Sequence, residues 1–292
     1  MCARIIPQDA AITGKHIRTL AIAAGEKYGL VVTPDCRYMA VSYFSENKLR
    51  VYRIEAGGAL TLLRAFGGYG DGPGDGPKQF NGPLKMCLAP NGNLLVCDRN
   101  NNRVQELTGL GEAEPVHVRD MKVANARTIA VHGDMVAVGT GDATVVLLSY
   151  STGAIIRTFG SKGTGRGNIG TAAQGLRFTL DGVYVLVAEW SNKRLSKFRV
   201  SDGAFVDFYC KGQVSDGEKD VEIAPSGEVI VADINAHRVC VFSADGRTLL
   251  RTWGTKGTAD GQFKEPTALA LVGNKLFVLD SFHNSARVQV FE

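Results

Sequence analysis

Acidic and arginine side chains recur at a nearly constant spacing and are the first candidates for chemistry. The pairs are Asp98 with Arg103, Glu189 with Arg194, Asp233 with Arg238 and Asp280 with Arg287. The acid precedes the arginine by five residues in three pairs and by seven in the last. Such pairs could form a binding rim, but a carboxylate that accepts hydrogen bonds from its own turn, braced by the arginine, is a local staple. Because a single active site needs asymmetry, we interpret the repeated pairs as structural staples.

Histidine, serine and cysteine give little support for catalysis. A catalytic zinc ion needs about three converging imidazoles or carboxylates and an open position. The histidines are scattered along the chain, at His16, His117, His132, His237 and His283. There is no G-x-S-x-G motif of a serine hydrolase, and the six cysteines include no C-x-x-C pair. The sequence therefore predicts no catalytic residue, no metal ligand and no cofactor.

The acid and arginine pairs belong to a unit that repeats along the whole chain. The position of the arginine is taken in the successive units by Lys48, Arg103, Thr144, Arg194, Arg238 and Arg287. The spacing between these positions runs from 41 to 55 residues, and each unit holds several short apolar runs separated by glycine turns. A period of about 40 to 50 residues with about four strands per unit is typical of a β-propeller, whose small sheets must stack on both faces. We predict an all-β chain in which residues 1–292 form a single six-bladed β-propeller domain.

Several of these units resemble the NHL repeat. The second unit has Phe66-Gly67, Gln79-Phe80 and the run NGNLLVCDRNNNRVQ at 91–105. The run WGTKGTADGQF at 253–263 and the core NAHRV at 235–239 are similar to the same repeat. The resemblance implies an NHL-type propeller. It does not select a function, because the family includes RNA-binding, protein-binding and lyase members.

The two ends of the sequence predict how the ring closes. The sixth unit stops at Phe291-Glu292, after its third strand. The run KHIRTL at 15–20 aligns with IIRTF at 155–159 and LLRTW at 249–253, which are expected to be outer strands. We therefore predict that this N-terminal strand pairs with the last blade and closes the ring.

Charged residues fall at inner-strand positions, where they would line the central channel. They are Lys85, Arg177, Asp220 and Glu222. Arg177 and Glu222 belong to adjacent units, so we expect them to form an ion pair beside the channel. Contact between Lys85, Arg177 or Glu222 and a ligand in the channel is the alternative.

The long loops and the turns between second and third strands should emerge on one face of the ring, the loop-rich face. Aromatic and basic residues are predicted there, and as partner-binding residues we select Arg99, Trp190, Phe44, Phe282, Lys193 and Tyr69. Such side chains anchor protein partners, and they also stack bases and pair phosphates of single-stranded RNA. The alternative is that Trp190 and Phe44 cover blade edges as part of the core.

These observations favour a non-catalytic recognition platform that binds a protein or a single-stranded RNA on the loop-rich face. The net charge of +4 names no partner, but acidic loop residues weaken the field that RNA binding needs, so protein is slightly favoured. The alternative, implied by the resemblance, is a lyase- or lactonase-like enzyme with a metal at the mouth of the channel. No long uncharged apolar stretch is present. We therefore expect no membrane contact, a cytoplasmic location, and a monomer or the binding domain of a larger protein.

Overall fold

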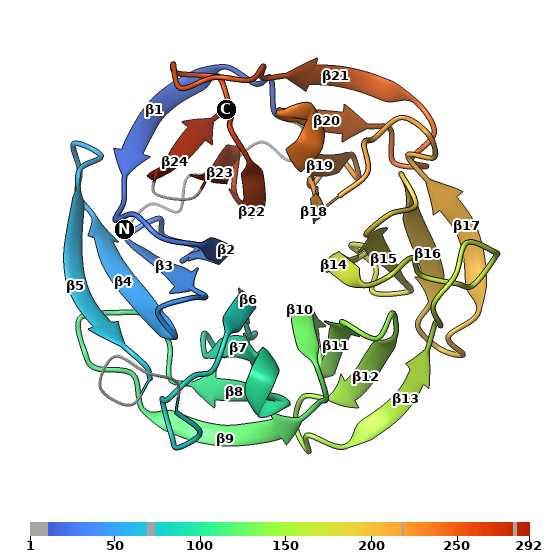
Figure 1. Ribbon diagram of the computed structural model, residues 1–292, viewed down its shortest axis with the longest axis horizontal. Coiled ribbons are helices and arrows are strands. Elements are labelled where there is room, and N and C mark those ends of the chain that lie inside the picture. The colour runs from blue at the N-terminus through green and yellow to red at the C-terminus, as the bar shows by residue number, and fades with distance from the viewer. Residues whose placement is uncertain (1–10, 69–73, 218, 283–284) are drawn as a thin grey trace.

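A ring of six four-stranded antiparallel sheets forms the molecule (Figure 1). The computed structural model describes residues 11–68, 74–217, 219–282 and 285–292. From the inner strand outward, blade 1 contains β2 (Lys27–Val32), β3 (Tyr38–Tyr43), β4 (Lys48–Ile54) and β5 (Leu60–Phe66). Blade 2 contains β6 (Pro83–Leu88), β7 (Leu94–Asp98), β8 (Arg103–Leu107) and β9 (His117–Lys122), and blade 3 contains β10 (Ala126–His132), β11 (Met135–Thr140), β12 (Val145–Ser149) and β13 (Ile155–Phe159). Blade 4 contains β14 (Ala173–Phe178), β15 (Tyr184–Glu189), β16 (Leu195–Arg199) and β17 (Phe205–Tyr209), and blade 5 contains β18 (Lys219–Ile223), β19 (Val229–Asp233), β20 (Arg238–Phe242) and β21 (Leu249–Trp253). Blade 6 contains β22 (Pro266–Val272), β23 (Lys275–Phe282), β24 (Ser285–Phe291) and, outermost, β1 (His16–Ala21).

The six-bladed all-β fold predicted from the repeats is confirmed, and burial along the strands shows why the blades must stack. Every residue of the second strands β7 and β19 is buried, whereas β13, at the rim of blade 3, is buried only at Phe159. The apolar side chains of each sheet therefore have to pack against both neighbours. Leu95 of blade 2 and Val138 of blade 3, for example, share one core cluster.

The ring closes as predicted. β1 pairs antiparallel with β24, and Leu20 lies opposite Val288 in the register. Leu20 is 2% exposed and packs in a cluster that joins blades 6 and 1. Figure 1 shows β1 lying outside β24 at the rim of the ring. A strand from the start of the chain thus completes the last blade and removes its open edge.

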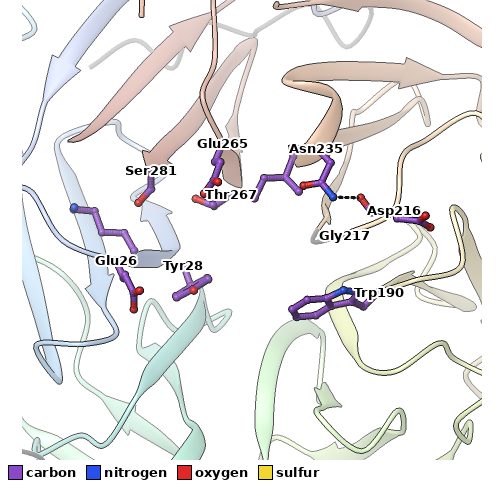
Figure 2. A pocket seen from close by; sticks show the side chains of 11 residues that line it. Glu26, Tyr28, Trp190, Asp216, Gly217, Asn235, Glu265, Thr267 and Ser281 are labelled. Carbon is purple, nitrogen blue, oxygen red and sulfur yellow. Dashed lines mark hydrogen bonds between the residues drawn. The ribbon is translucent and has the colours of Figure 1, made fainter. Parts of the chain in front are cut away.

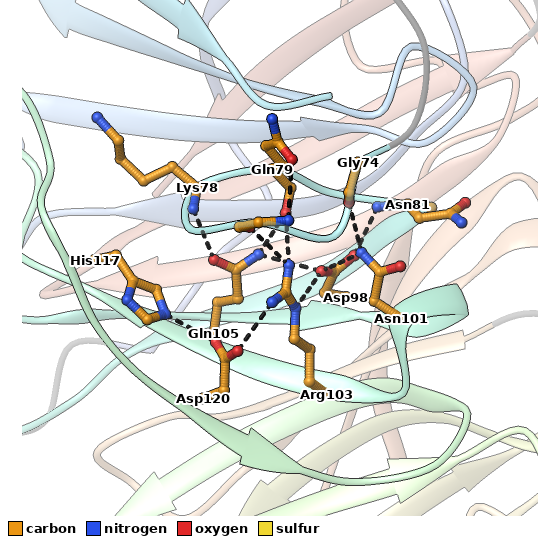
Figure 3. A network of polar contacts seen from close by, with 12 residues as sticks. Gly74, Lys78, Gln79, Asn81, Asp98, Asn101, Arg103, Gln105, His117 and Asp120 are labelled. Atoms are coloured by element: carbon orange, nitrogen blue, oxygen red, sulfur yellow. Dashed lines mark hydrogen bonds and ion pairs between the residues drawn. The ribbon is translucent and has the colours of Figure 1, made fainter. Parts of the chain in front are cut away.

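The acid and arginine pairs are ion-paired, and they hold the loop that arrives from the preceding blade. Arg103 Nε lies 2.8 Å from Asp98 Oδ2. Asp98 Oδ1 accepts a 2.7 Å hydrogen bond from the backbone N–H of Asn81, and Arg103 Nη2 donates 3.0 Å bonds to the carbonyls of Gly76 and Gln79. Figure 3 shows these bonds converging from the loop onto one buried pair. The staple therefore fixes the path of a glycine-rich loop on the loop-rich face.

The staple prediction is confirmed for the side chains of the turn and wrong for its backbone, since Asp98 Oδ2 accepts a 2.9 Å hydrogen bond from Asn101 Nδ2 of the turn. Within the described residues, neither Asp98 nor Asp233 caps the backbone of the short 3₁₀ turn that follows it, η1 (Arg99–Asn101) or η2 (Ile234–Ala236). Each turn closes itself instead, because the next residue has a left-handed φ near +54° and returns its N–H to the first carbonyl of the turn. The backbone N–H groups that the acid accepts therefore come from the incoming loop, as with Asn81 on Asp98 and Ser215 on Asp233.

Candidate functional site

The start of the inner strand is irregular in most blades, and this irregularity shapes the mouth of the channel. The strand register shifts near the beginning of β2, β6, β10, β14 and β22. The side chains that fall within these shifts include Tyr28, Lys85, Arg127, Gln174 and Thr267. A β-bulge re-aims the side chain that it carries. Polar and aromatic groups are therefore gathered around the axis just below the loop-rich face.

Lys85 forms the floor of this mouth. Its Nζ lies 2.8 Å from Asp220 Oδ2 and donates a 2.6 Å hydrogen bond to the Thr267 carbonyl. Asp220 Oδ2 also accepts a 2.9 Å bond from the backbone N–H of Leu269. Because β6 and β18 face each other across the centre of the ring (Figure 1), Lys85 spans the channel. This cross-channel tie separates the mouth from the lower part of the channel.

The ion pair expected between Arg177 and Glu222 is present below the floor. Arg177 Nε donates a 2.6 Å hydrogen bond to Glu222 Oε2, and Arg177 Nη2 bonds the other carboxylate oxygen. Burial raises the pKa of Glu222 above its usual range, and the adjacent Arg177 acts in the opposite direction. All three predicted channel residues thus have protein partners, which favours the structural interpretation over ligand contact.

Above the floor lies a hollow of about 380 Å³ that we call the cup (Figure 2). Two aromatic residues, Tyr28 and Trp190, contribute to its lining, together with the carboxylates of Glu26, Asp216 and Glu265. The remaining lining residues are Lys27, Gly217, Ile234, Asn235, Thr267 and Ser281. The lining comes from blades 4, 5, 6 and 1 and from the loops that lead into them. The cup is therefore an asymmetric site on a nearly symmetric ring.

The charged groups of the cup differ in how strongly they interact with other protein groups. Lys27 is 1% exposed and donates a 2.6 Å hydrogen bond to the Gly25 carbonyl, and burial lowers its pKa from 10.5 to about 8. Asp216 lies 3.4 Å from Lys193, and both side chains are more than half exposed, so this pair is weak. Glu26 is exposed and forms no ion pair with any residue that the structure describes. The lining contains three carboxylates and one cation, Lys27, so its charge is predominantly negative.

Neighbouring side chains hold the aromatic walls in place. The guanidinium carbon of Arg127 lies 5.6 Å from the centre of the Trp190 ring, and Arg127 Nη2 donates a 3.1 Å hydrogen bond to Gln174 Oε1. The ring of Phe44 meets that of Tyr28 edge to face, 5.6 Å between centres. Trp190 nevertheless stays 38% exposed. The cup thus presents a positioned aromatic surface to the solvent.

The predicted partner-binding residues have different positions relative to the cup. Trp190 lines it, and Lys193 approaches it through the pair with Asp216. Phe44 packs against the core of blades 2 and 3 behind Tyr28. Arg99 donates a 2.8 Å hydrogen bond to Asn125 and lies outside the lining, as does Phe282, whose ring centre is 5.3 Å from Lys264 Nζ. Tyr69 lies outside the described residues.

Sequence reasoning missed the residues that the register shifts bring to the mouth. Arg127, Gln174 and Thr267 read as ordinary inner-strand positions, because a bulge leaves no mark in a pattern of short apolar runs. Asn235 belongs to the NAHRV core, which the sequence relates only to the repeat, and the structure places it in the lining of the cup. The one available signal was charge, since Glu26 and Asp216 stand in loops that lead directly into inner strands.

No group of three or more His, Cys, Asp or Glu side chains in the described ranges is arranged to hold a metal ion. The same part of the chain has no helix of the length and apolarity that crossing a membrane requires.

Comparison with known proteins bears on the family of the chain. No curated protein matches the sequence. A family model of the NHL repeat matches residues 80–107, which include β6, β7, η1 and β8 of blade 2. The match falls on one of six blades that share the same strand order and, in four of them, the same pairing of acid and arginine. The chain is a six-bladed β-propeller whose second blade matches the NHL repeat.

Proposed function

We propose that this propeller binds a protein partner on its loop-rich face and that a basic side chain of the partner enters the cup. NHL propellers generally mediate protein interactions. The observation that carries the finer proposal is the cup itself, in which two aromatic residues and three carboxylates line one hollow of about 380 Å³. That the protein is a monomer or the binding domain of a larger protein, and that it is located in the cytoplasm, stay predictions.

The chemistry of the lining suits an arginine or a lysine. A guanidinium is flat, stacks on aromatic faces and donates paired hydrogen bonds to carboxylates. Tyr28 and Trp190 supply the aromatic surface, and Glu26 and Asp216 supply exposed acceptors beside it. The cross-channel tie of Lys85 limits the depth to which a side chain can enter.

The same lining disfavours single-stranded RNA at this position. RNA needs cations along its phosphates and open aromatic faces for its bases. Several cations in the loops that lead into the inner strands already contact protein groups: Lys264 lies over Phe282, Lys211 over Phe208 and Arg166 over Phe205. Three carboxylates in the cup would repel a phosphate. These features support a protein partner.

Fluorescence anisotropy with defined probes tests the proposal. The probes are a labelled peptide with three arginines separated by Gly-Ser spacers, the same peptide with citrulline in place of arginine, and a labelled oligouridylate of similar length. Citrulline keeps the shape of arginine and removes the charge. We expect the arginine peptide to bind at least about tenfold more tightly than the citrulline peptide, because charge-assisted hydrogen bonds are lost.

A matched pair of variants locates the binding. Glu26→Gln should weaken binding of the arginine peptide, and Asp202→Asn should not. Asp202 is an exposed carboxylate in the turn between β16 and β17, on the opposite face. Equal binding of the arginine and citrulline peptides would contradict a cationic guest in the cup. So would an oligouridylate that binds more tightly than the arginine peptide and whose affinity Glu26→Gln leaves unchanged.

A further inference from the structure

The closure of the ring leaves a second hollow, of about 450 Å³, on the face opposite the cup. It lies between blade 6 and blade 1, where the outer strand β1 meets the turns of the first blade. Its lining comes from β1, the start of β23 and β24 of blade 6, and from the end of β4 and the turns β2–β3 and β4–β5 of blade 1. We call it the seam pocket.

The seam pocket has an apolar floor. Leu20, Phe277 and Val290 are each at most 3% exposed, and Ile17 and Ile54 flank them. A hollow of this volume with apolar walls and a few polar groups is within the range of small-molecule sites. The floor would accept an acyl chain or an aromatic body.

The carboxylates at the rim of the seam pocket are engaged with the protein. Asp35 accepts hydrogen bonds from Thr33 Oγ1 at 2.6 Å and from the backbone N–H of Arg37 at 3.0 Å. Glu55 lies 2.9 Å from Arg53 Nε and accepts a 2.6 Å bond from Thr61 Oγ1. Neither acid faces the pocket as an unsatisfied acceptor.

Two cations at the rim have no such partner. In the ranges that the structure describes, the side chains of Arg18 and Lys275 make no hydrogen bond or ion pair. Arg18 reaches across the seam, since a Cβ placed on Gly58 would lie 2.1 Å from its Nη1. A half-buried guanidinium and an ammonium beside an apolar floor form a place for an anionic head group.

We propose that the seam pocket binds a small amphipathic anion, with its apolar body on Leu20, Phe277 and Val290 and its carboxylate between Arg18 and Lys275. This proposal is independent of the partner that the cup receives. It also gives β1 a second role, because the strand that closes the ring supplies both part of the floor and one of the two cations.

Cys36 provides a reporter inside the pocket. Its thiol lines the hollow, and it is half-buried, while Cys87, Cys97, Cys210 and Cys240, the other cysteines in the described part of the chain, are buried. Cys2 lies outside the described residues, so a Cys2→Ser background removes the remaining thiol. A bound ligand should shield Cys36 from a small alkylating reagent.

The experiment measures the rate of Cys36 alkylation by iodoacetamide in the Cys2→Ser protein, without and with octanoate. Octylammonium, with the same chain and the opposite charge, is the matched probe. We expect octanoate to slow alkylation in a saturable manner and octylammonium to give no protection at equal concentration. The double variant Arg18→Gln/Lys275→Gln should need about tenfold more octanoate for the same protection.

Two controls keep the outcomes distinct. Burial raises the pKa of the Cys36 thiol and the charge of Lys275 opposes this rise, so the ratio of rates with and without ligand is compared within each variant. Lys122→Gln, at an exposed position of β9, removes a positive charge far from the seam. Equal protection by the two probes, or full protection in the double variant, would overturn the proposal, as would an alkylation rate that octanoate does not change.

Discussion

Individual residues give the cup its aromatic and acidic lining, and the sequence predicted the position of only some of them. Trp190 was predicted as an anchor and lines the hollow, because a large aromatic residue in a turn is conspicuous. Its support by Arg127 was not predictable, since Arg127 reaches the channel mouth through a local shift in register. The sequence supplies residue types at the turns, and the bulges decide which of them meet.

Lys27 should make the stability of the protein depend on pH. Its folded-state pKa of about 8 lies below the ordinary value of 10.5. Between these values the unfolded chain holds a proton that the folded chain has released, so the free energy of unfolding rises with pH. We expect wild-type protein to gain about 1–2 kcal/mol more than Lys27→Met between about pH 7 and about pH 9.5, measured by urea denaturation. The same pH dependence in both proteins would show that Lys27 titrates normally.

Trp190→Ala should weaken binding of the arginine peptide without unfolding the protein. An exposed aromatic anchor typically contributes about 1–4 kcal/mol to binding. Because Trp190 is 38% exposed, its removal should leave the melting temperature nearly unchanged. Arg99→Ala, which removes a side chain outside the cup, is the companion variant and should have the smaller effect on binding. A large fall in melting temperature for Trp190→Ala would instead assign its ring to the core.

At the scale of elements, the staples connect stability with the shape of the loop-rich face. Asp233 is fully buried and accepts a 3.0 Å bond from the backbone N–H of Ser215, the residue before Asp216 of the cup. Arg238 Nε lies 3.2 Å from the same carboxylate. The recurrence of acid and arginine predicted these pairs. The direction of the bonds, toward the incoming loop, depends on the self-closing 3₁₀ turn and was not predictable from spacing.

Asp233→Ala and Asp98→Ala form a matched test of this connection. Each removes a buried acceptor of loop amides, and each should lower the free energy of unfolding by about 1–3 kcal/mol in chemical denaturation. Only Asp233→Ala should also weaken binding of the arginine peptide, because the loop held by Asp98 contributes no residue to the lining of the cup. If the two variants bound the arginine peptide equally well, the staple at Asp233 would have no special effect on the cup.

At the scale of the whole molecule, the arrangement of six blades in a closed ring was the most predictable feature. Six repeats of short apolar runs allow few arrangements, and burial on both faces of each sheet selects the ring. The closing strand was predictable because the run at 15–20 repeats the pattern of outer strands. The two hollows were not, because each forms where blades and turns distant in sequence come together.

Deletion of residues 1–20 should open the ring. It removes most of β1 and Leu20, exposing the edge of β24 and the apolar surface between blades 6 and 1. We expect a lower melting temperature, and we expect aggregation that light scattering detects. Deletion of residues 1–10, which retains β1, is the control. A monomeric 1–20 deletion with the melting temperature of the full chain would contradict closure by this strand.

The central claim, that a basic side chain of a protein partner enters the cup, is tested most directly by the fluorescence of Trp190. The chain has two tryptophans, so Trp253→Phe leaves Trp190 as the single emitter. The account predicts a saturable change in emission on titration with the arginine peptide, a much weaker response to the citrulline peptide and none to oligouridylate. An emission that the arginine peptide leaves unchanged, or that oligouridylate changes in its place, would contradict it.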